Sequence, residues 1–198
     1  MSPTRQPGRK ELSHERIVDA AARAIRRGGF AGVGVAEIMK EAGLTHGGFY
    51  AHFPSRDALL VEALERASLE SAKNALGSAQ DARLQGTSAF HKLVAGYLSE
   101  AHLKGAETGC AVAALASEMP RQSTAVQKAA AQSVRRMLGV VKQALRPGVA
   151  PEVASAIACQ MVGALQMARA LRANAEGKSL LAAVRRQLLA QYDTPRQH

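Results

Sequence analysis

The chain has 198 residues, of which 47% are hydrophobic and 21% charged, a composition ordinary for a folded soluble protein with a sizeable core. Its net charge of +10 favours a polyanionic partner such as DNA. Residues 1–60 carry 9 Lys/Arg against 6 Asp/Glu, and residues 61–198 carry 17 against 10. The excess of positive charge is therefore not concentrated at one end of the chain. Two cysteines exclude a disulfide framework, the polar N-terminus excludes a signal peptide, and polar side chains within the most apolar stretch, 153–171, exclude a membrane span. We therefore expect a cytoplasmic protein.

Alanine- and leucine-rich stretches without strand-type alternation predict an all-α protein. The first helix is expected to open at Ser13, to bury a stripe that includes Ile17 and Ile25, and to end at Gly28–Gly29. Phe30 follows and is expected to fill the core before the next helix begins.

Residues 35–59, VAEIMKEAGLTHGGFYAHFPSRDAL, contain the most informative pattern of the chain. Spacings of three and four give the first helix of this segment one buried face, made by Val35, Ile38, Met39 and Ala42. Gly43 stands where that helix must stop in the left-handed conformation, and Thr45 is expected to cap the helix that follows. Two short helices joined by such a turn form a helix-turn-helix, which places its second helix in the major groove of DNA.

A long helix is expected to start at Pro54–Ser55, with Ser55 as its cap, and to run well past residue 70. Further helices are predicted at roughly 87–103, 110–118, 121–146, 151–174 and 178–191. Pro147 ends one of these helices and Pro151 suits the first turn of the next. We expect a three-helix helix-turn-helix domain over residues 11–57, followed by a helical regulatory and dimerisation domain over residues 58–192.

Residues 13–60 resemble the N-terminal DNA-binding domain of the TetR family of transcriptional regulators. The matching features are an opening helix that ends in glycines and Phe30, then VAEIMKEAGLTHGGFYAHF, then PSRDALLVEAL. The rest of the chain agrees only in length and helix count, and Gly34 departs from the pattern because many members have a Thr or Ser cap there. The resemblance implies a ligand-responsive dimeric repressor, with no catalytic residues and no cofactor, that releases a palindromic operator when its effector binds.

The resemblance also implies that residues 45–53 form the recognition helix. The residues that it assigns to DNA are Thr45, His46, Gly47, Gly48, Tyr50, His52 and Arg56. The two glycines let the backbone approach the groove, Tyr50 would meet a phosphate or a thymine methyl, and Arg56 would hold a phosphate. Phe49 and Phe53 are expected in the core instead. Few of the assigned side chains can make bidentate base contacts, so specificity is expected to rest partly on DNA shape and half-site spacing.

The family further implies a dimer and a ligand cavity in the C-terminal part. The apolar stripes of the last two helices would form the dimer interface through Val153, Ile157, Met161, Leu165, Leu181, Val184 and Leu188. Candidates that face the cavity are Phe90, Leu93, Tyr97, Met119, Val134, Met137 and Val141. The spacing alone leaves open whether both sets are simply buried within one subunit.

Cys110 follows Thr108–Gly109 and is expected in the first turn of a helix, where the helix dipole favours the thiolate. Some relatives sense electrophiles or oxidants through a cysteine in this domain, so a thiol-based repressor that uses Cys110 is an alternative. The other interpretation of Cys110 is a small buried hydrophobe. Cys159 lies on an alanine-rich helix face and is expected to pack there.

An alternative of another class is a helical ligand-binding protein with a vestigial helix-turn-helix, which salt-dependent DNA binding would exclude. An enzyme is not expected, because the sequence has no phosphate-binding Gly-rich loop and no Ser/His/Asp arrangement. His91, His102 and Cys110 stand eleven and eight residues apart, intervals that suit no common metal template. The expected partners are a double-stranded DNA operator, a second copy of the chain and a small-molecule or reactive effector, with no membrane.

Overall fold

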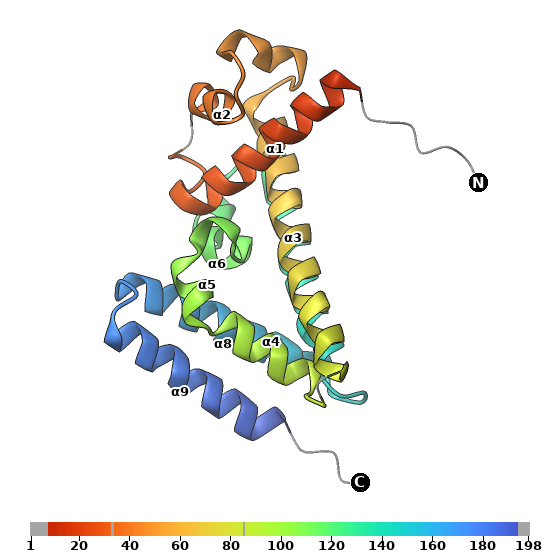
Figure 1. Ribbon diagram of the computed structural model, residues 1–198, viewed down its shortest axis with the longest axis vertical. Coiled ribbons are helices and arrows are strands. Elements are labelled where there is room, and N and C mark those ends of the chain that lie inside the picture. Colours follow the sequence, from red (N-terminus) through yellow and green to blue (C-terminus); the bar gives the residue numbers. More distant parts are fainter. Residues whose placement is uncertain (1–7, 33, 85, 194–198) are drawn as a thin grey trace, which may run out of the picture.

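The computed structural model describes residues 8–32, 34–84 and 86–193, which form helices only (Figure 1). The elements are α1 (Arg9–Gly28), α2 (Val35–Glu41), the 3₁₀ helix η1 (His46–Ala51), α3 (Arg56–Leu84), α4 (Ala89–Tyr97), α5 (Glu100–Lys104), η2 (Ala106–Thr108), α6 (Ala111–Leu115), η3 (Met119–Arg121), α7 (Thr124–Ala144), α8 (Pro151–Ala170) and α9 (Ala175–Tyr192). The prediction of an all-α protein is confirmed. Within the described ranges, no helix combines the length and the apolar character needed to cross a bilayer.

The long helix α3 connects the two ends of the molecule (Figure 1). At one end, α1 crosses α3, and α2 and η1 pack beside them; at the other end, α4, α8 and α9 lie close together. One apolar core joins α1, α2, η1 and the first half of α3 to α6 and the start of α7. A second core is formed by α4, α8, α9 and the end of α7. The short elements α5 to η3 lie where the two cores meet.

Helix α1 begins at Arg9, four residues before the predicted start at Ser13. The sequence prediction missed that the Glu11 carboxylate accepts the backbone N–H of Gly8, at 2.7 Å, and so satisfies a donor that the helix start leaves free. Helix α1 ends at Gly28 as predicted, with Gly29 in the left-handed region at φ +76°. Phe30 is 1% exposed and fills the core.

The helix-turn-helix forms with one difference from the prediction. Gly43 adopts the left-handed conformation at φ +72°, and α2 buries Ile38 and Met39 as its spacing requires. The second helix, however, is a short 3₁₀ helix over His46–Ala51, and the Thr45 hydroxyl makes no capping hydrogen bond. Gly47 and Gly48 within six residues lower the helix propensity, and short runs of this kind favour the tighter 3₁₀ geometry.

The predicted helix at 87–103 is two helices, because Ser99 starts a second one. Helix α4 ends at Tyr97, and the Ser99 Oγ accepts the backbone N–H of His102, at 3.1 Å, as the cap of α5. Helix α8 begins at Pro151 as predicted. Helix α9 begins three residues before the predicted start, because the Asn174 side chain accepts the backbone N–H of Gly177 at 3.0 Å.

Candidate functional sites

The tip of the helix-turn-helix presents an uncharged, exposed surface. Thr45, His46 and Gly47 are exposed, and Tyr50 is 75% exposed. The Tyr50 ring stands edge-on to Phe49, with 5.2 Å between ring centroids, and Phe49 itself is buried. Phe53 is buried as well, so both phenylalanines lie in the core as predicted. The short helix therefore anchors one face in the core and offers the other to a partner.

The two glycines of η1 are not required by packing within the chain. A Cβ atom added at Gly47 would meet nothing within 4 Å. At Gly48 the nearest side-chain atom would be the Met39 Cε, at the ordinary contact distance of 3.6 Å. Glycine inside a helix costs roughly 0.5–1 kcal/mol relative to alanine, and packing within the chain does not account for this cost at either position.

His52 and Arg56 are half-buried at the edge of the tip. Burial lowers the pKa of His52, and the nearby His14 and Lys10 lower it further, so the imidazole is neutral at pH 7. Its Nδ1 atom is buried and has no hydrogen-bond partner among the described residues. Arg56 donates from Nη2 to the Phe30 carbonyl and so ties the start of α3 to the connector after α1.

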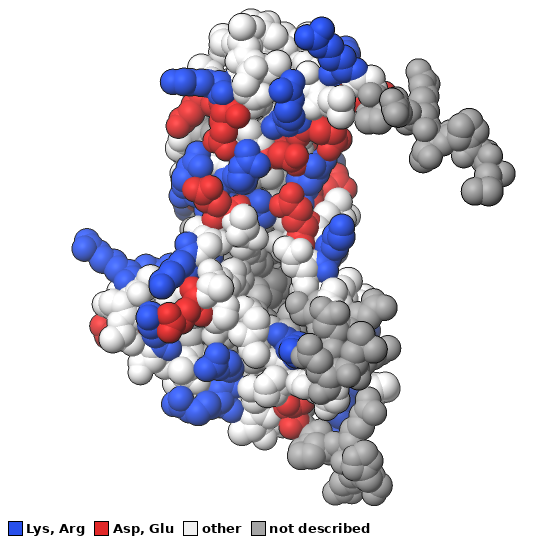
Figure 2. Space-filling view, in the orientation of Figure 1, with Lys and Arg blue, Asp and Glu red and all other residues white. Residues whose placement is uncertain are grey.

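The distribution of charged side chains differs between the tip of the helix-turn-helix and the middle of the molecule. Figure 2 shows Lys and Arg around a largely uncharged upper end, and mixed charges below it. In the mixed zone Arg23 and Arg27 both pair with Glu41, at 3.0 and 3.2 Å, and Arg66 pairs with Asp19. Within the described residues, the cations that make no ion pair include Arg9, Lys10, Arg16 and Lys40, all in the N-terminal helices.

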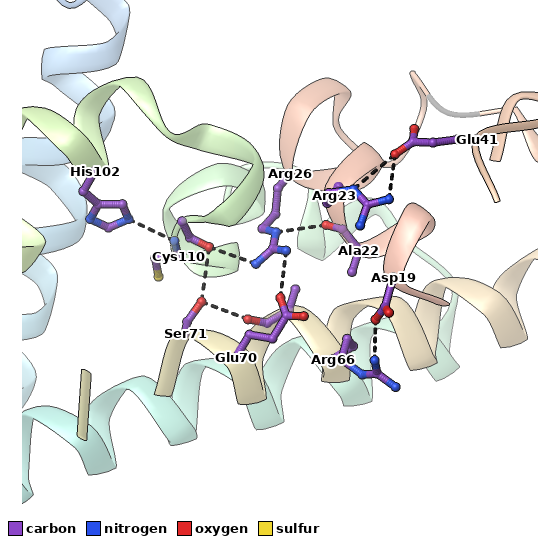
Figure 3. Close-up of polar contacts among 12 residues, drawn as sticks. Asp19, Ala22, Arg23, Arg26, Glu41, Arg66, Glu70, Ser71, His102 and Cys110 are labelled. Atoms are coloured by element: carbon purple, nitrogen blue, oxygen red, sulfur yellow. Dashed lines mark hydrogen bonds and ion pairs between the residues drawn. The ribbon is translucent and has the colours of Figure 1, made fainter. Parts of the chain in front are cut away.

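A buried arginine joins the helix-turn-helix end to the rest of the chain (Figure 3). The side chain of Arg26, near the end of α1, is 2% exposed. Its guanidinium donates to the carbonyl of Ala22 at 2.9 Å, to the carbonyl of Gly109 at 3.3 Å and to the carboxylate of Glu70 at 2.9 Å. The Gly109 carbonyl also accepts the hydroxyl of Ser71 on α3, at 3.2 Å.

The segment before α6 is fixed by His102. Its Nδ1 lies 2.8 Å from the Tyr97 carbonyl, which can only accept, so Nδ1 carries the proton and Nε2 accepts the backbone N–H of Cys110, at 3.0 Å. Burial lowers the pKa of His102 and keeps the ring neutral, which matches this arrangement. A Cβ atom at Gly109 would lie 2.7 Å from His102 Nε2, so only glycine permits the close approach.

A cavity of about 250 Å³ opens beside this segment, between α3, α4, α7 and the start of α6. Its apolar lining includes Ala72, Ala75, Leu93, Val112, Met137 and Val141. The Cys110 thiol is on its wall, 3.5 Å from the Met137 sulfur. The Tyr97 hydroxyl is buried beside that thiol and makes no hydrogen bond of normal geometry to a described residue. Burial raises the pKa of Tyr97, so its hydroxyl stays protonated.

Four of the seven predicted cavity residues line it, namely Leu93, Tyr97, Met137 and Val141. The other three do not. Phe90 packs edge-on against Tyr192, Met119 belongs to the N-terminal core, and Val134 is 37% exposed. The sequence prediction also missed the polar lining residues Ser68, His102, Ser133 and Arg136, because it considered mainly apolar side chains between residue 87 and Pro147.

The residues predicted for the dimer interface are largely used inside the chain. Ile157, Met161, Leu165, Leu181 and Leu188 are at most 2% exposed, and Val153 and Val184 are half-buried. The opposite face of α8 carries the exposed residues Ala156, Cys159, Met167 and Ala170. Cys159 is therefore exposed, contrary to the expectation that it packs.

The sequence matches two family profiles. One is described as "Bacterial regulatory proteins, tetR family" and matches residues 17–63, and the other as "Transcriptional regulator LmrA/YxaF-like, C-terminal domain" and matches residues 86–187. A curated relative, the uncharacterized HTH-type transcriptional regulator YerO of Bacillus subtilis, is 43% identical over 51 residues. That match covers 26% of this chain and only 18% of the relative.

Solved structures share the fold at low sequence identity. The reduced form of NemR from E. coli gives a TM-score of 0.70 at 23% identity, with 87% of this chain and 94% of that chain covered. A TetR-family regulator from Cytophaga hutchinsonii gives 0.74 at 16% identity, with 95% and 98% covered. A third, from Agrobacterium tumefaciens, gives 0.72 at 19% identity, with 92% and 98% covered.

These matches agree with the observed geometry. The first profile falls on the helix-turn-helix and its flanking helices, and the second covers more than half of the chain, including every helix that surrounds the cavity except α3. The chain therefore belongs to the TetR family of transcriptional regulators.

Proposed function

We propose that the protein is a homodimeric, ligand-responsive repressor that acts in the cytoplasm and releases a palindromic operator when an effector occupies the cavity. The observation that carries this proposal is the Gly109 carbonyl. It belongs to the cavity lining, yet it accepts a hydrogen bond from Arg26 of the DNA-binding helices. A ligand that displaces this segment would thus change how α1 is held.

The proposed DNA surface is the exposed side of η1. Tyr50 offers a ring and a hydroxyl, Thr45 and His46 stand at the start of the helix, and Gly47 leaves the backbone accessible. His52 is half-buried at the edge of this surface, so any contact with the DNA backbone would come from the exposed part of its ring. Because Arg56 donates to Phe30, we assign it to positioning the start of α3 in addition to any phosphate contact.

Gly47→Ala and Tyr50→Ala should weaken binding to the intergenic DNA upstream of the gene by about 10- to 100-fold, the equivalent of roughly 1–3 kcal/mol. Both positions have open space around them, so neither variant should lower the thermal stability of the free protein. The measurement is an electrophoretic shift with purified protein at two salt concentrations, because operator binding must weaken as salt rises.

Gly77→Ala is the matched control. Gly77 is also an exposed helical glycine whose added Cβ would meet nothing within 4 Å, but it lies in the middle of α3. If all three variants bind the operator like the wild type, the helix-turn-helix does not act as proposed and the protein is a ligand-binding protein only.

The proposed dimer surface is the outer face of α8 together with the exposed side of α9. Small side chains at Ala156, Cys159 and Ala170 permit close helix approach, and the exposed Met167 supplies apolar area. On α9 the exposed Ala183 and Ala190 lie two helical turns apart and continue this surface. A four-helix bundle with a second copy would bury both faces.

The proposed mechanism is a shift between two dimer states. One state has its recognition helices spaced for successive major grooves, and the other holds the cavity open for the effector. An effector can drive DNA release only as far as its affinity differs between the two states.

A thiol-directed signal is a second candidate, and the position of Cys110 favours it. Its thiol is 6% exposed and faces the cavity beside Tyr97 and Met137, so a reactive compound would have to enter the cavity first. Cys159 is exposed within one chain but lies on the proposed dimer face, where the second copy would cover it.

Cys110→Ser should abolish release of DNA by an oxidant or electrophile if this second candidate is correct, while Cys159→Ser should leave release unchanged. The readout is the electrophoretic shift before and after treatment with iodoacetamide or peroxide. Release that persists in the Cys110→Ser protein would exclude the thiol mechanism.

A further inference from the structure

Among the described residues, the permanently charged side chains that line the cavity are all positive. Among the described residues that line it, Lys92 and Arg136 are cations, and there is no Asp or Glu. Two described acids stand next to lining residues in the sequence, and both form ion pairs with α1: Glu70 pairs with Arg26 and Glu107 with Arg27. A largely apolar cavity with cations and no acid in its wall attracts anions and repels cations.

Arg136 is the more important of these two cations. It projects from α7, and its Nη1 donates to the Ser68 Oγ at 2.8 Å. Ser68 is 6% exposed and lines the cavity, so the guanidinium lies against the cavity wall. Arg136 also borders a separate outer groove with Glu65, but it makes no ion pair with any described carboxylate. A guanidinium has five N–H donors in a fork that fits a carboxylate, and most of them remain available here.

Elsewhere on the cavity wall, the Ser133 hydroxyl already has a hydrogen-bond partner, and the Tyr97 hydroxyl suits an uncharged group of a ligand. The buried Ser133 hydroxyl donates to the Ala129 carbonyl, at 3.1 Å. The Tyr97 hydroxyl, which stays protonated and lies beside the Cys110 thiol, can donate one hydrogen bond to a ligand. The apolar part of the lining consists of alanine, valine, leucine and methionine side chains. The cavity thus offers an apolar surface together with the Arg136 guanidinium and the Tyr97 hydroxyl.

We propose that the effector is a small amphipathic carboxylic acid, bound as its anion. Its carboxylate pairs with Arg136, and its apolar part lies against Leu93, Met137 and Val141. The volume of about 250 Å³ falls below the roughly 300–1,000 Å³ of sites for drug-sized ligands, so the acid is short-chain or single-ringed. This assignment rests on the proposed function, because it names the ligand class of the same cavity.

The test compares matched probes that differ only in their head group. Binding of hexanoate, hexan-1-ol and hexylamine, and of benzoate, benzyl alcohol and benzylamine, is measured by calorimetry on the full-length protein at pH 7.5. Each carboxylate should bind at least tenfold more tightly than its alcohol, and the amines should bind most weakly. Arg136→Met should reduce carboxylate affinity at least tenfold and leave alcohol affinity unchanged.

Arg135→Met is the matched control, since Arg135 is the exposed neighbour on α7 and does not line the cavity. It removes the same charge and should not change carboxylate affinity. Arg136→Lys keeps the charge without the fork and should retain part of the preference, and it replaces the Met variant if that variant does not fold.

Three outcomes would overturn the inference: no carboxylate binds, an amine binds as tightly as its carboxylate, or the Arg136 and Arg135 variants behave alike. These failures are separable from failure of the proposed function. If an alcohol or amine binds and releases operator DNA in the shift assay, the repressor function stands and only the ligand class is wrong. If the wild type binds no operator in a salt-dependent manner, the proposed function fails whatever the probes do.

Discussion

Arg26→Met is expected to lower the free energy of unfolding by about 2–4 kcal/mol. The side chain is 2% exposed and donates to the carbonyls of Ala22 and Gly109 and to Glu70. Methionine fills much of the volume of arginine but has no N–H donor. The carbonyl oxygens of Ala22 and Gly109, buried where the two cores meet, would each lose one hydrogen bond. The Glu70 carboxylate is 41% exposed and can turn to water, so its loss of a partner adds little.

The measurement is urea unfolding followed by circular dichroism, in which the midpoint should fall while the slope stays constant. Arg23→Met is the control on the same helix. Arg23 is 40% exposed and pairs with Glu41 at the surface, so its loss should cost at most about 1 kcal/mol. Equal losses in the two variants would show that Arg26 is an ordinary surface arginine in energetic terms.

Met167→Glu is expected to convert the proposed dimer to monomers and to weaken operator binding by 100-fold or more. Met167 is 62% exposed within one chain, so glutamate there should not disturb the subunit fold. In a symmetric dimer that buries the outer face of α8, the change places two carboxylates in one apolar interface, and each would lose its hydration without gaining a partner. A monomer holds one half-site only and loses the benefit of simultaneous contact.

Sedimentation velocity at micromolar concentration measures the assembly state directly. Leu69→Glu, on α3, serves as the control because Leu69 is 48% exposed and lies outside α8 and α9. That variant should remain dimeric. A Met167→Glu protein that stays dimeric would place the interface on a different face of the chain.

Much of the N-terminal domain follows from the sequence because its determinants are local. Gly43 must be left-handed for the turn, and the result depends on only a few neighbouring residues. Phe49 and Phe53 are buried for the same reason, since a helix held at this angle can turn only one side to α1 and α3. The predicted Thr45 cap is absent, and the sequence pattern did not distinguish an α-helix from the 3₁₀ helix that the two glycines favour here.

The regulatory half is less predictable because its sites are formed by distant segments. Arg26 and Gly109 are 83 residues apart, and Ser68 and Arg136 are 68 apart, so no spacing rule connects either pair. Apolar periodicity located the stripes of α8 and α9 but could not tell which partner they face. Met161 and Leu165 pack within the chain, whereas the smaller residues on the other side of α8 remain outside.

The hydrogen bonds at Gly109 and Cys110 all belong to one peptide group. Its carbonyl oxygen accepts from Arg26 and Ser71, and its N–H donates to His102. A peptide group is planar and rigid, so a rotation that turns the oxygen away from α1 also turns the N–H away from the imidazole. The links to α1, α3 and α5 are therefore made or broken together. If the proposed effector turns this peptide group, all three links would be lost in one step, and the DNA-binding end and the cavity would change together within each subunit.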